Sequence, residues 1–131
     1  MSGAARINGT ARTILATAGL FLALGIVLGA VGTHALRAQL PPDRFATFET
    51  AVSYHFYNAL GLLGIGAVAL SLQSKLLRWS AGLIVAGILL FSGSLYLAAL
   101  DAPRMLHMLP PFGGVAWIVG WVLFAVAVWR G

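Results

Sequence analysis

The chain has no cysteine and very few charged residues, and each of these absences excludes some classes of protein. Without cysteine there is no disulfide framework and no thiolate chemistry, which leaves three histidines as the strongest soft-donor metal ligands. Only 8% of its 131 residues are charged and 60% are hydrophobic, whereas soluble domains carry about 25% charged residues. The apolar side chains must therefore face lipid as well as one another, so the lipid bilayer is the first expected partner.

Acidic residues are scarce as well: three Asp and Glu stand against eight Lys and Arg, for a net charge of +5. In a soluble protein this balance would suggest a nucleic-acid partner. Here the basic residues are scattered singly or in pairs between apolar blocks, a pattern typical of loops that border a membrane. We therefore expect no nucleic-acid binding.

Four segments are candidates for crossing a bilayer, which takes about 20 predominantly apolar residues. The first apolar run exceeds the roughly 7–15 residues of a signal-peptide core, so we favour an uncleaved span over a signal peptide. The strictly apolar part of the second, Ala59–Leu72, is too short, so this span must begin near Ser53. An amphipathic interfacial start from residue 42 precedes it. We place the spans at about 13–36, 53–72, 79–100 and 112–130.

This pattern predicts an all-α fold, a four-transmembrane-helix bundle built of two hairpins. Residues 1–12 are expected to form a short disordered cytoplasmic tail, and 13–131 a single membrane domain. With four spans, both termini and the 73–78 turn share one side, whose five basic residues are Arg6, Arg12, Lys75, Arg78 and Arg130. The other side holds all three acids and Arg37, Arg44 and Arg104. Basic loops favour the cytoplasm, so we expect both termini there.

Polar side chains gather in the outer half of the predicted spans and form a candidate cluster. Its members are His34, Glu49, Tyr54, His55, Asn58, Ser92, Ser94 and Tyr96. Ionisable residues inside a membrane often mark a ligand or proton site, but Asn, Ser and His also hydrogen-bond neighbouring helices together. We favour the second interpretation and keep the first as the alternative. In either case we predict one connected hydrogen-bond network formed by His34, His55, Asn58, Ser92 and Tyr96.

Glycines recur at helical spacing and predict close helix contacts. Small residues let helix backbones approach where lipid offers no hydrophobic drive to association. On the first span Gly25, Gly29 and Gly32 would form a groove, and on the fourth we assign the same packing role to Gly113, Gly114 and Gly120.

Catalytic motifs are missing from the sequence. There is no phosphate-binding loop, no dinucleotide fingerprint and no G-x-S-x-G motif. The run Phe91–Ser94 resembles a nucleophile elbow only superficially, because it lies mid-helix without a positioned base. Two histidines on different helices could ligate a haem or a metal, but no spacing motif supports this. We therefore predict no enzyme activity, no cofactor and no metal site.

Four motifs in order resemble a known family. They are Gly29–Leu36, Phe48–Leu60, Leu90–Leu97, and Pro111–Gly114 together with Gly120-Trp121. Together they resemble domain-of-unknown-function family 423, also called the YgdD or transmembrane-protein-256 family, from about residue 13 to the end of the chain. The resemblance implies a small four-span protein of the bacterial inner membrane, with mitochondrial relatives. It implies architecture and location, and no particular activity.

Two positions depart from the pattern expected of that family. Where Tyr-Gln-x-Tyr-His is expected, this chain has Tyr54-His55-Phe56-Tyr57-Asn58, so the histidine is displaced by three residues, about one helical turn. A hydrogen-bonding role would survive this shift better than a strict metal or haem ligand would. Where Thr-Pro is expected before the glycine pair, the chain has Pro110-Pro111.

The leading functional hypothesis is an accessory or stabilising subunit of a larger membrane assembly, with a membrane protein or a second copy as partner. The alternative is a minimal transporter with an outward-facing site for a small molecule, an ion or a proton. Four spans leave little room for an alternating-access cavity, which transporters commonly build from repeats or broken helices, so we favour interaction.

Overall fold

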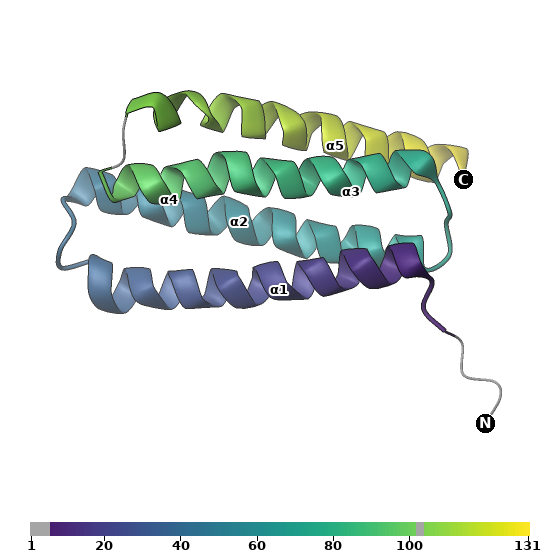
Figure 1. The fold of residues 1–131 in the computed structure, drawn as a ribbon, viewed down its shortest axis with the longest axis horizontal. Coiled ribbons are helices and arrows are strands. Elements are labelled where there is room, and N and C mark those ends of the chain that lie inside the picture. The colour runs from purple at the N-terminus through teal and green to yellow at the C-terminus, as the bar shows by residue number, and fades with distance from the viewer. Residues whose placement is uncertain (1–5, 102–103) are drawn as a thin grey trace.

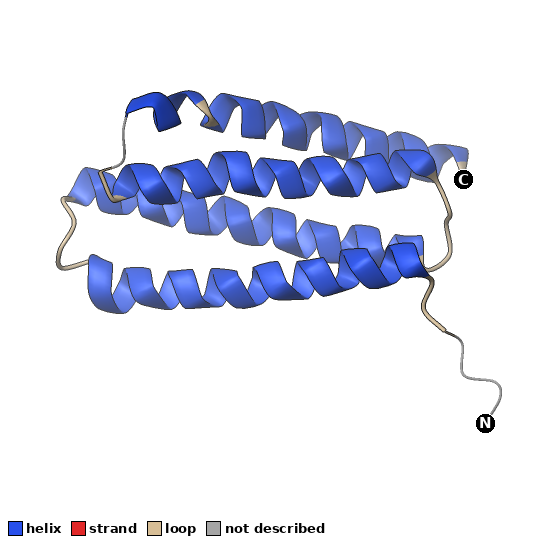
Figure 2. Cartoon of the chain, in the orientation of Figure 1, coloured by secondary structure: helices blue, strands red, loops and turns tan. Residues whose placement is uncertain are grey.

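A computed structural model of the chain describes residues 6–101 and 104–131. Over these residues it is all-helical, without strands, and the helical segments form four rods (Figure 2). The first rod is α1 (Gly9–Val31) with a π-helical end, η1 (Gly32–Leu36), and the second is α2 (Pro42–Ala69). The third joins α3 (Lys75–Gly87), the π-helical segment η2 (Ile88–Gly93) and α4 (Ser94–Ala99). The fourth is α5 (Pro110–Arg130), preceded by the 3₁₀ turn η3 (Arg104–Met108).

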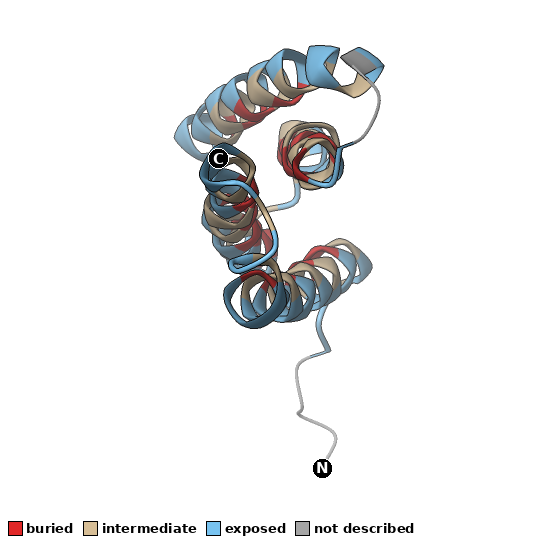
Figure 3. Cartoon of the chain, turned by 90° about the vertical axis from the view of Figure 1, so that its left-hand side faces the viewer, coloured by how far each residue is buried: buried red, intermediate tan, exposed pale blue. Residues whose placement is uncertain are grey.

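The rods pack as two hairpins. The closest associations are between α1 and α2 and between α3 and α5, while α2 also packs on η2 and α4. The start of α1, the connection between α2 and α3, and the end of α5 lie at one end of the molecule (Figure 1). Buried residues line the faces that the helices turn toward one another, and the outward faces are exposed (Figure 3). The largest fully buried apolar side chains are Leu62 and Ile65 on α2 and Leu77 and Ile84 on α3.

Two polar caps set helix starts that differ from the predicted ones. The Asn8 side-chain oxygen accepts a hydrogen bond from the backbone N–H of Ala11 at 2.8 Å, so α1 begins at Gly9, inside the segment expected to be a disordered tail. The same side chain donates to the Ala69 carbonyl at the end of α2, at 2.9 Å. Ser74 likewise caps α3, which begins at Lys75 rather than at residue 79. Asn and Ser are preferred at this position because their oxygens satisfy orphan helix N–H groups.

Three helices of the described chain are long and apolar enough to cross a membrane: Gly9–Leu36, Lys75–Ala99 and Met105–Arg130. The 28 residues of α2 span about 42 Å at 1.5 Å per residue, which is ample length. Its composition is more polar, because Asp43, Arg44 and Glu49 occupy its first turns and histidine and asparagine follow. The sequence prediction of a spanning helix is therefore supported for three rods by length and composition alone.

Candidate functional site

His55 is the most deeply enclosed ionisable side chain of the predicted cluster, with 1% of its surface exposed. Its Nε2 atom lies 2.7 Å from the backbone carbonyl oxygen of Phe21 on α1, and its Nδ1 atom lies 2.9 Å from the Tyr96 hydroxyl on α4. A carbonyl oxygen can only accept, so Nε2 carries the proton. In the neutral ring Nδ1 then accepts from the Tyr96 hydroxyl. One imidazole thus joins three helices, and neither nitrogen keeps a free lone pair for a metal.

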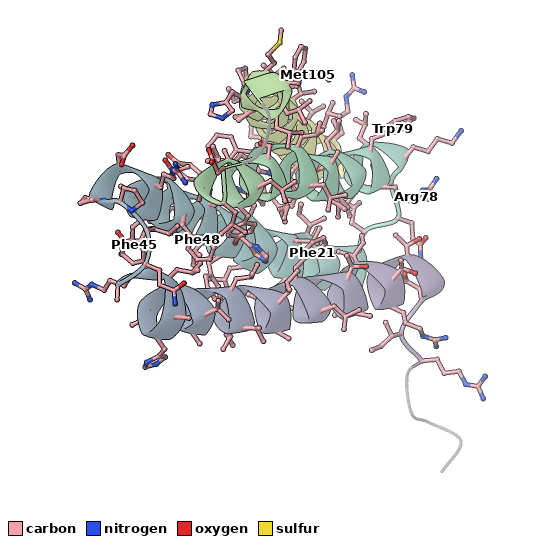
Figure 4. All side chains as sticks on the ribbon, turned by 60° about the vertical axis from the view of Figure 1, so that its left-hand side comes forward. Phe21, Phe45, Phe48, Arg78, Trp79 and Met105 are labelled. Carbon is pink, nitrogen blue, oxygen red and sulfur yellow. The ribbon has the colours of Figure 1, made fainter. Side chains whose placement is uncertain are left out.

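Gly25 creates the space in which His55 reaches α1. A Cβ atom at Gly25 would lie 3.3 Å from His55 Cδ2 and 3.0 Å from the Phe56 ring, which is tighter than ordinary contact. Gly25 follows Phe21 by one helical turn, so the missing side chain leaves the Phe21 carbonyl open to an outside donor. The Phe21 ring packs edge-on against the imidazole, with ring centroids 5.8 Å apart. Phe21 and Phe48 lie between α1 and the other helices, where they flank this contact (Figure 4).

Asn58 makes a second, separate link, between α2 and α5. Its side-chain oxygen accepts a hydrogen bond from Trp121 Nε1 at 3.1 Å, and its amide group donates to the Tyr54 carbonyl in its own helix at 3.0 Å. A glycine again follows one turn later, because a Cβ at Gly61 would lie 2.3 Å from the Trp121 ring. The indole therefore fits only against a glycine.

Two further hydrogen bonds join α3 to α5. Trp117 Nε1 donates to the Ile84 carbonyl at 3.1 Å, and the Ser80 hydroxyl donates to the Gly120 carbonyl at 2.7 Å. Gly87, one turn after Ile84, receives the Trp117 ring, since a Cβ there would lie 2.2 Å from the indole. No role was predicted for Ser80, Trp117 or Trp121. The tryptophan contacts could have been predicted from two facts. A buried indole N–H needs a hydrogen-bond acceptor, and the helix carbonyls that a donor can reach are those beside a glycine.

The prediction of one connected network is wrong. Within the described residues His55 bonds to Tyr96 and Asn58 bonds to Trp121, but no hydrogen bond joins the two pairs. His34 is exposed, because it follows the buried Gly32 by two residues and so lies on the opposite side of the helix. Ser92 is fully buried, yet its hydroxyl has no hydrogen-bond partner in the part of the chain that the structure describes.

The other predicted cluster members are also dispersed. The Ser94 hydroxyl donates to carbonyls of its own helix, at Leu90 and Phe91. Glu49 is exposed, and among the described side chains the ion pair found is instead Arg44 with Asp101, at 3.6 Å. Residues 6–101 and 104–131 contain no group of three His, Asp or Glu side chains placed to hold a metal.

The six glycines predicted to pack divide into tight and open positions. Four are at close contacts with other helices: Gly25, Gly32, Gly113 and Gly120. The tightest is Gly113, where a Cβ would lie 2.5 Å from the backbone nitrogen of Phe91. Gly29 has only an ordinary contact, 3.7 Å to Val52, and at Gly114 a Cβ would meet no described atom within 4 Å. Gly61 is a further tight contact, and Gly66 and Gly87 are tight contacts at positions where none was predicted.

A surface groove of about 720 Å³ lies between α2 and α5. Aromatic rings line it: Tyr54 stacks on Trp117 with ring centroids 5.8 Å apart and an angle of 11°, and Phe91 lies 4.7 Å from the same indole. Tyr57, Ile118 and the open Gly114 form its outer edge. We call it the aromatic groove. Its lining is mostly apolar, with Asn58 at its base.

Long apolar helices with exposed outward faces, joined by inward hydrogen bonds, define an α-helical membrane protein. The family of proteins of unknown function DUF423 matches residues 28–114, and the chain belongs to this family. The family resemblance drawn from the sequence motifs is thus confirmed.

Relatives cover nearly the whole chain. It is 40% identical over 115 residues to the UPF0382 membrane protein YwdK of Bacillus subtilis, covering 87% of this chain and 92% of that protein. It is 35% identical over 117 residues to the UPF0382 membrane protein SAB0533 of Staphylococcus aureus, covering 89% and 93%. It is 31% identical over 121 residues to the UPF0382 inner membrane protein YgdD of Escherichia coli K12, covering 92% of each. No solved structure matches the chain significantly.

Proposed function

We propose that the protein is a four-span protein of the bacterial inner membrane that acts as an accessory subunit, docking a transmembrane helix of another membrane protein in the aromatic groove. The fourth span is α2. It packs against apolar helices on both sides and turns His55 and Asn58 inward, so its polar groups need not meet lipid. The name of the Escherichia coli relative supports the inner membrane, and the excess of basic residues at the end holding both termini supports a cytoplasmic placement.

The observation that carries an interaction role is the contrast between the interior and the aromatic groove. In the interior, the His55 ring and the Asn58 side chain hydrogen-bond to neighbouring helices. The side chains best suited to chemistry therefore hold the helices together. Outside, the groove combines stacked aromatic rings with an open glycine, Gly114. Membrane helices associate through close packing at small residues. A partner helix could pack closely against Gly114, beside the aromatic rings of the groove.

Site-specific photo-crosslinking in intact membranes tests this proposal. A photoreactive residue at Ile118, which is 67% exposed in the groove, should give one discrete adduct with another membrane protein. The control position is Leu20 on α1, which is 74% exposed and lies outside the groove. Gly114→Leu, which fills open space, should abolish the Ile118 adduct while the protein stays folded. Equal adducts from both positions would contradict a specific docking face, and an adduct of doubled mass would identify a second copy as the partner.

A small aromatic molecule in the same groove is the second candidate. It is favoured by the stack of Tyr54 on Trp117 and by Asn58 at the base, which together offer ring faces and a polar group. Mass spectrometry of the protein after gentle extraction separates the two proposals. A small bound species lost from Gly114→Leu, without any protein adduct at Ile118, would favour the molecule.

A further inference from the structure

Two adjoining hollows lie at the end of the molecule where α1 and α3 begin. One, of about 590 Å³, runs between α1 and α3 over the buried Leu62, with Ile14 and Thr17 on one wall and Ala81 and Gly82 on the other. The second, of about 480 Å³, is lined by Lys75, Arg78 and Trp79. Arg78 lines both, so a cationic mouth leads into an apolar groove. Figure 4 shows Arg78 at this end, on the side of α3 that is close to the start of α1.

The charges at this mouth are unbalanced. The first turn of α3 contains Lys75 and Arg78 and no acid, and the first turn of α1 contains Arg12 and no acid. A helix N-terminus carries a partial positive charge, so cations there are unfavourable and an anion is favoured. The three acids of the chain lie elsewhere: Asp43 and Glu49 in the first turns of α2, and Asp101 after α4, all toward the opposite end. An anion from outside the chain would offset this charge.

The groove itself has no comparable demand for polar partners. Leu62 and Ile14 are buried beneath it, and the Thr13 hydroxyl on its wall already donates to the Gly9 carbonyl of its own helix. A Cβ at Gly82 would meet no described atom within 4 Å, so the groove is open along α3. Such a surface suits a hydrocarbon chain. Trp79, which is 67% exposed beside the mouth, is the residue type that settles at the headgroup level of a bilayer.

We propose that this groove, the Arg78 groove, binds one anionic phospholipid. Its headgroup phosphate is held by Arg78 and Lys75, and one acyl chain lies between α1 and α3. Basic pockets between membrane helices suit such headgroups, with each cation near the surface strengthening binding about five-fold. The proposal is independent of the partner helix in the aromatic groove, which lies between other helices.

Native mass spectrometry with competing lipids tests the headgroup. The purified protein is incubated with equal amounts of phosphatidylglycerol and phosphatidylcholine that carry identical acyl chains. The wild type should retain phosphatidylglycerol in clear preference, and Arg78→Gln and Lys75→Gln should each reduce its retention about five-fold. Arg37→Gln removes the same charge beyond η1 at the opposite end, and should leave retention unchanged. Equal retention of both lipids, or equal losses from Arg78→Gln and Arg37→Gln, would overturn the proposal.

A groove-filling variant tests the seat of the acyl chain. Gly82→Leu adds a side chain in open space, so the fold should persist while phosphatidylglycerol retention falls even though Arg78 is intact. Thr17→Leu on the facing wall provides a second filling if Gly82→Leu unfolds. Undiminished retention in folded filling variants would mean that the lipid binds only at the surface, and would overturn the groove site. A protein dimer that excludes lipid would show that a second copy occupies the groove, and would overturn it too.

Discussion

Gly25 lies across the α1–α2 contact from His55, where an added Cβ would come within 3.3 Å of the imidazole. This pairing recurs between other helices: Gly61 faces the ring of Trp121, and Gly87 faces the ring of Trp117. In each case the glycine follows the residue that accepts the hydrogen bond by about one helical turn, and the ring that donates the hydrogen bond packs against the glycine. The helices are therefore held together by side chains that donate hydrogen bonds next to glycines. These bonds satisfy the buried polar groups without water. Membrane proteins need this, because hydrocarbon offers no alternative partner.

Removing the Tyr96 hydroxyl should weaken the three-helix tie modestly. Tyr96→Phe leaves the His55 Nδ1 atom without its donor, and interhelical hydrogen bonds of this kind contribute about 0.6 kcal/mol on average. His55→Ala should lower the free energy of unfolding further, because it also removes a buried ring and frees the Phe21 carbonyl. Reversible unfolding in detergent of both single variants and the double variant measures the coupling. Strictly additive effects would show that the two side chains do not interact.

The adjacent glycines at the start of α5 provide a matched pair. Gly113→Ala should be strongly destabilising, because its Cβ would lie 2.5 Å from the backbone nitrogen of Phe91, and backbone cannot move aside as a flexible side chain can. Overpacking in a well-packed interior typically costs about 1–3 kcal/mol. Gly114→Ala should be neutral or slightly stabilising, since its position is open among the described atoms and alanine is the better helix former. Thermal unfolding distinguishes the two, and similar melting temperatures would refute the α5–η2 contact.

Membrane orientation can be read with reporter fusions. Fusions after Gly131 and within 73–78 should report the cytoplasm, and fusions within 101–110 the opposite side, because the first group adjoins five basic residues and the second group's side has three. Such fusions also test whether α2 crosses the bilayer. With only three spans, the two ends of the chain would lie on opposite sides.

The helical architecture was predictable from composition, whereas the internal contacts were not. Scarce charge and long apolar runs require helices, since each must satisfy its own backbone in lipid. The start of α1 was missed because the Asn8 cap was overlooked among the polar residues of the presumed tail. His34 was grouped with His55 by depth alone, and depth does not fix which side of a helix a residue occupies. No role was predicted for Trp121, although its indole N–H donates the hydrogen bond that Asn58 accepts.

Two buried serines on the third rod should respond oppositely to the same substitution. Ser80 donates to the Gly120 carbonyl at 2.7 Å, so Ser80→Ala removes an interhelical hydrogen bond and should lower stability by about 0.6 kcal/mol, the average for such bonds. The Ser92 hydroxyl is buried without a partner among the described residues. An unsatisfied buried group costs about 1–3 kcal/mol, so Ser92→Ala should stabilise the protein.

The free energies of unfolding of the two serine variants are compared in the same detergent. Both variants replace serine with alanine, so effects common to that substitution cancel in the comparison. A loss of stability in Ser92→Ala as large as that in Ser80→Ala would contradict an unpartnered hydroxyl. It would mean that Ser92 has a partner in the membrane-embedded protein, such as a water molecule held beside the π-helical segment η2. The sign of this single change therefore decides whether the interior at η2 is dry.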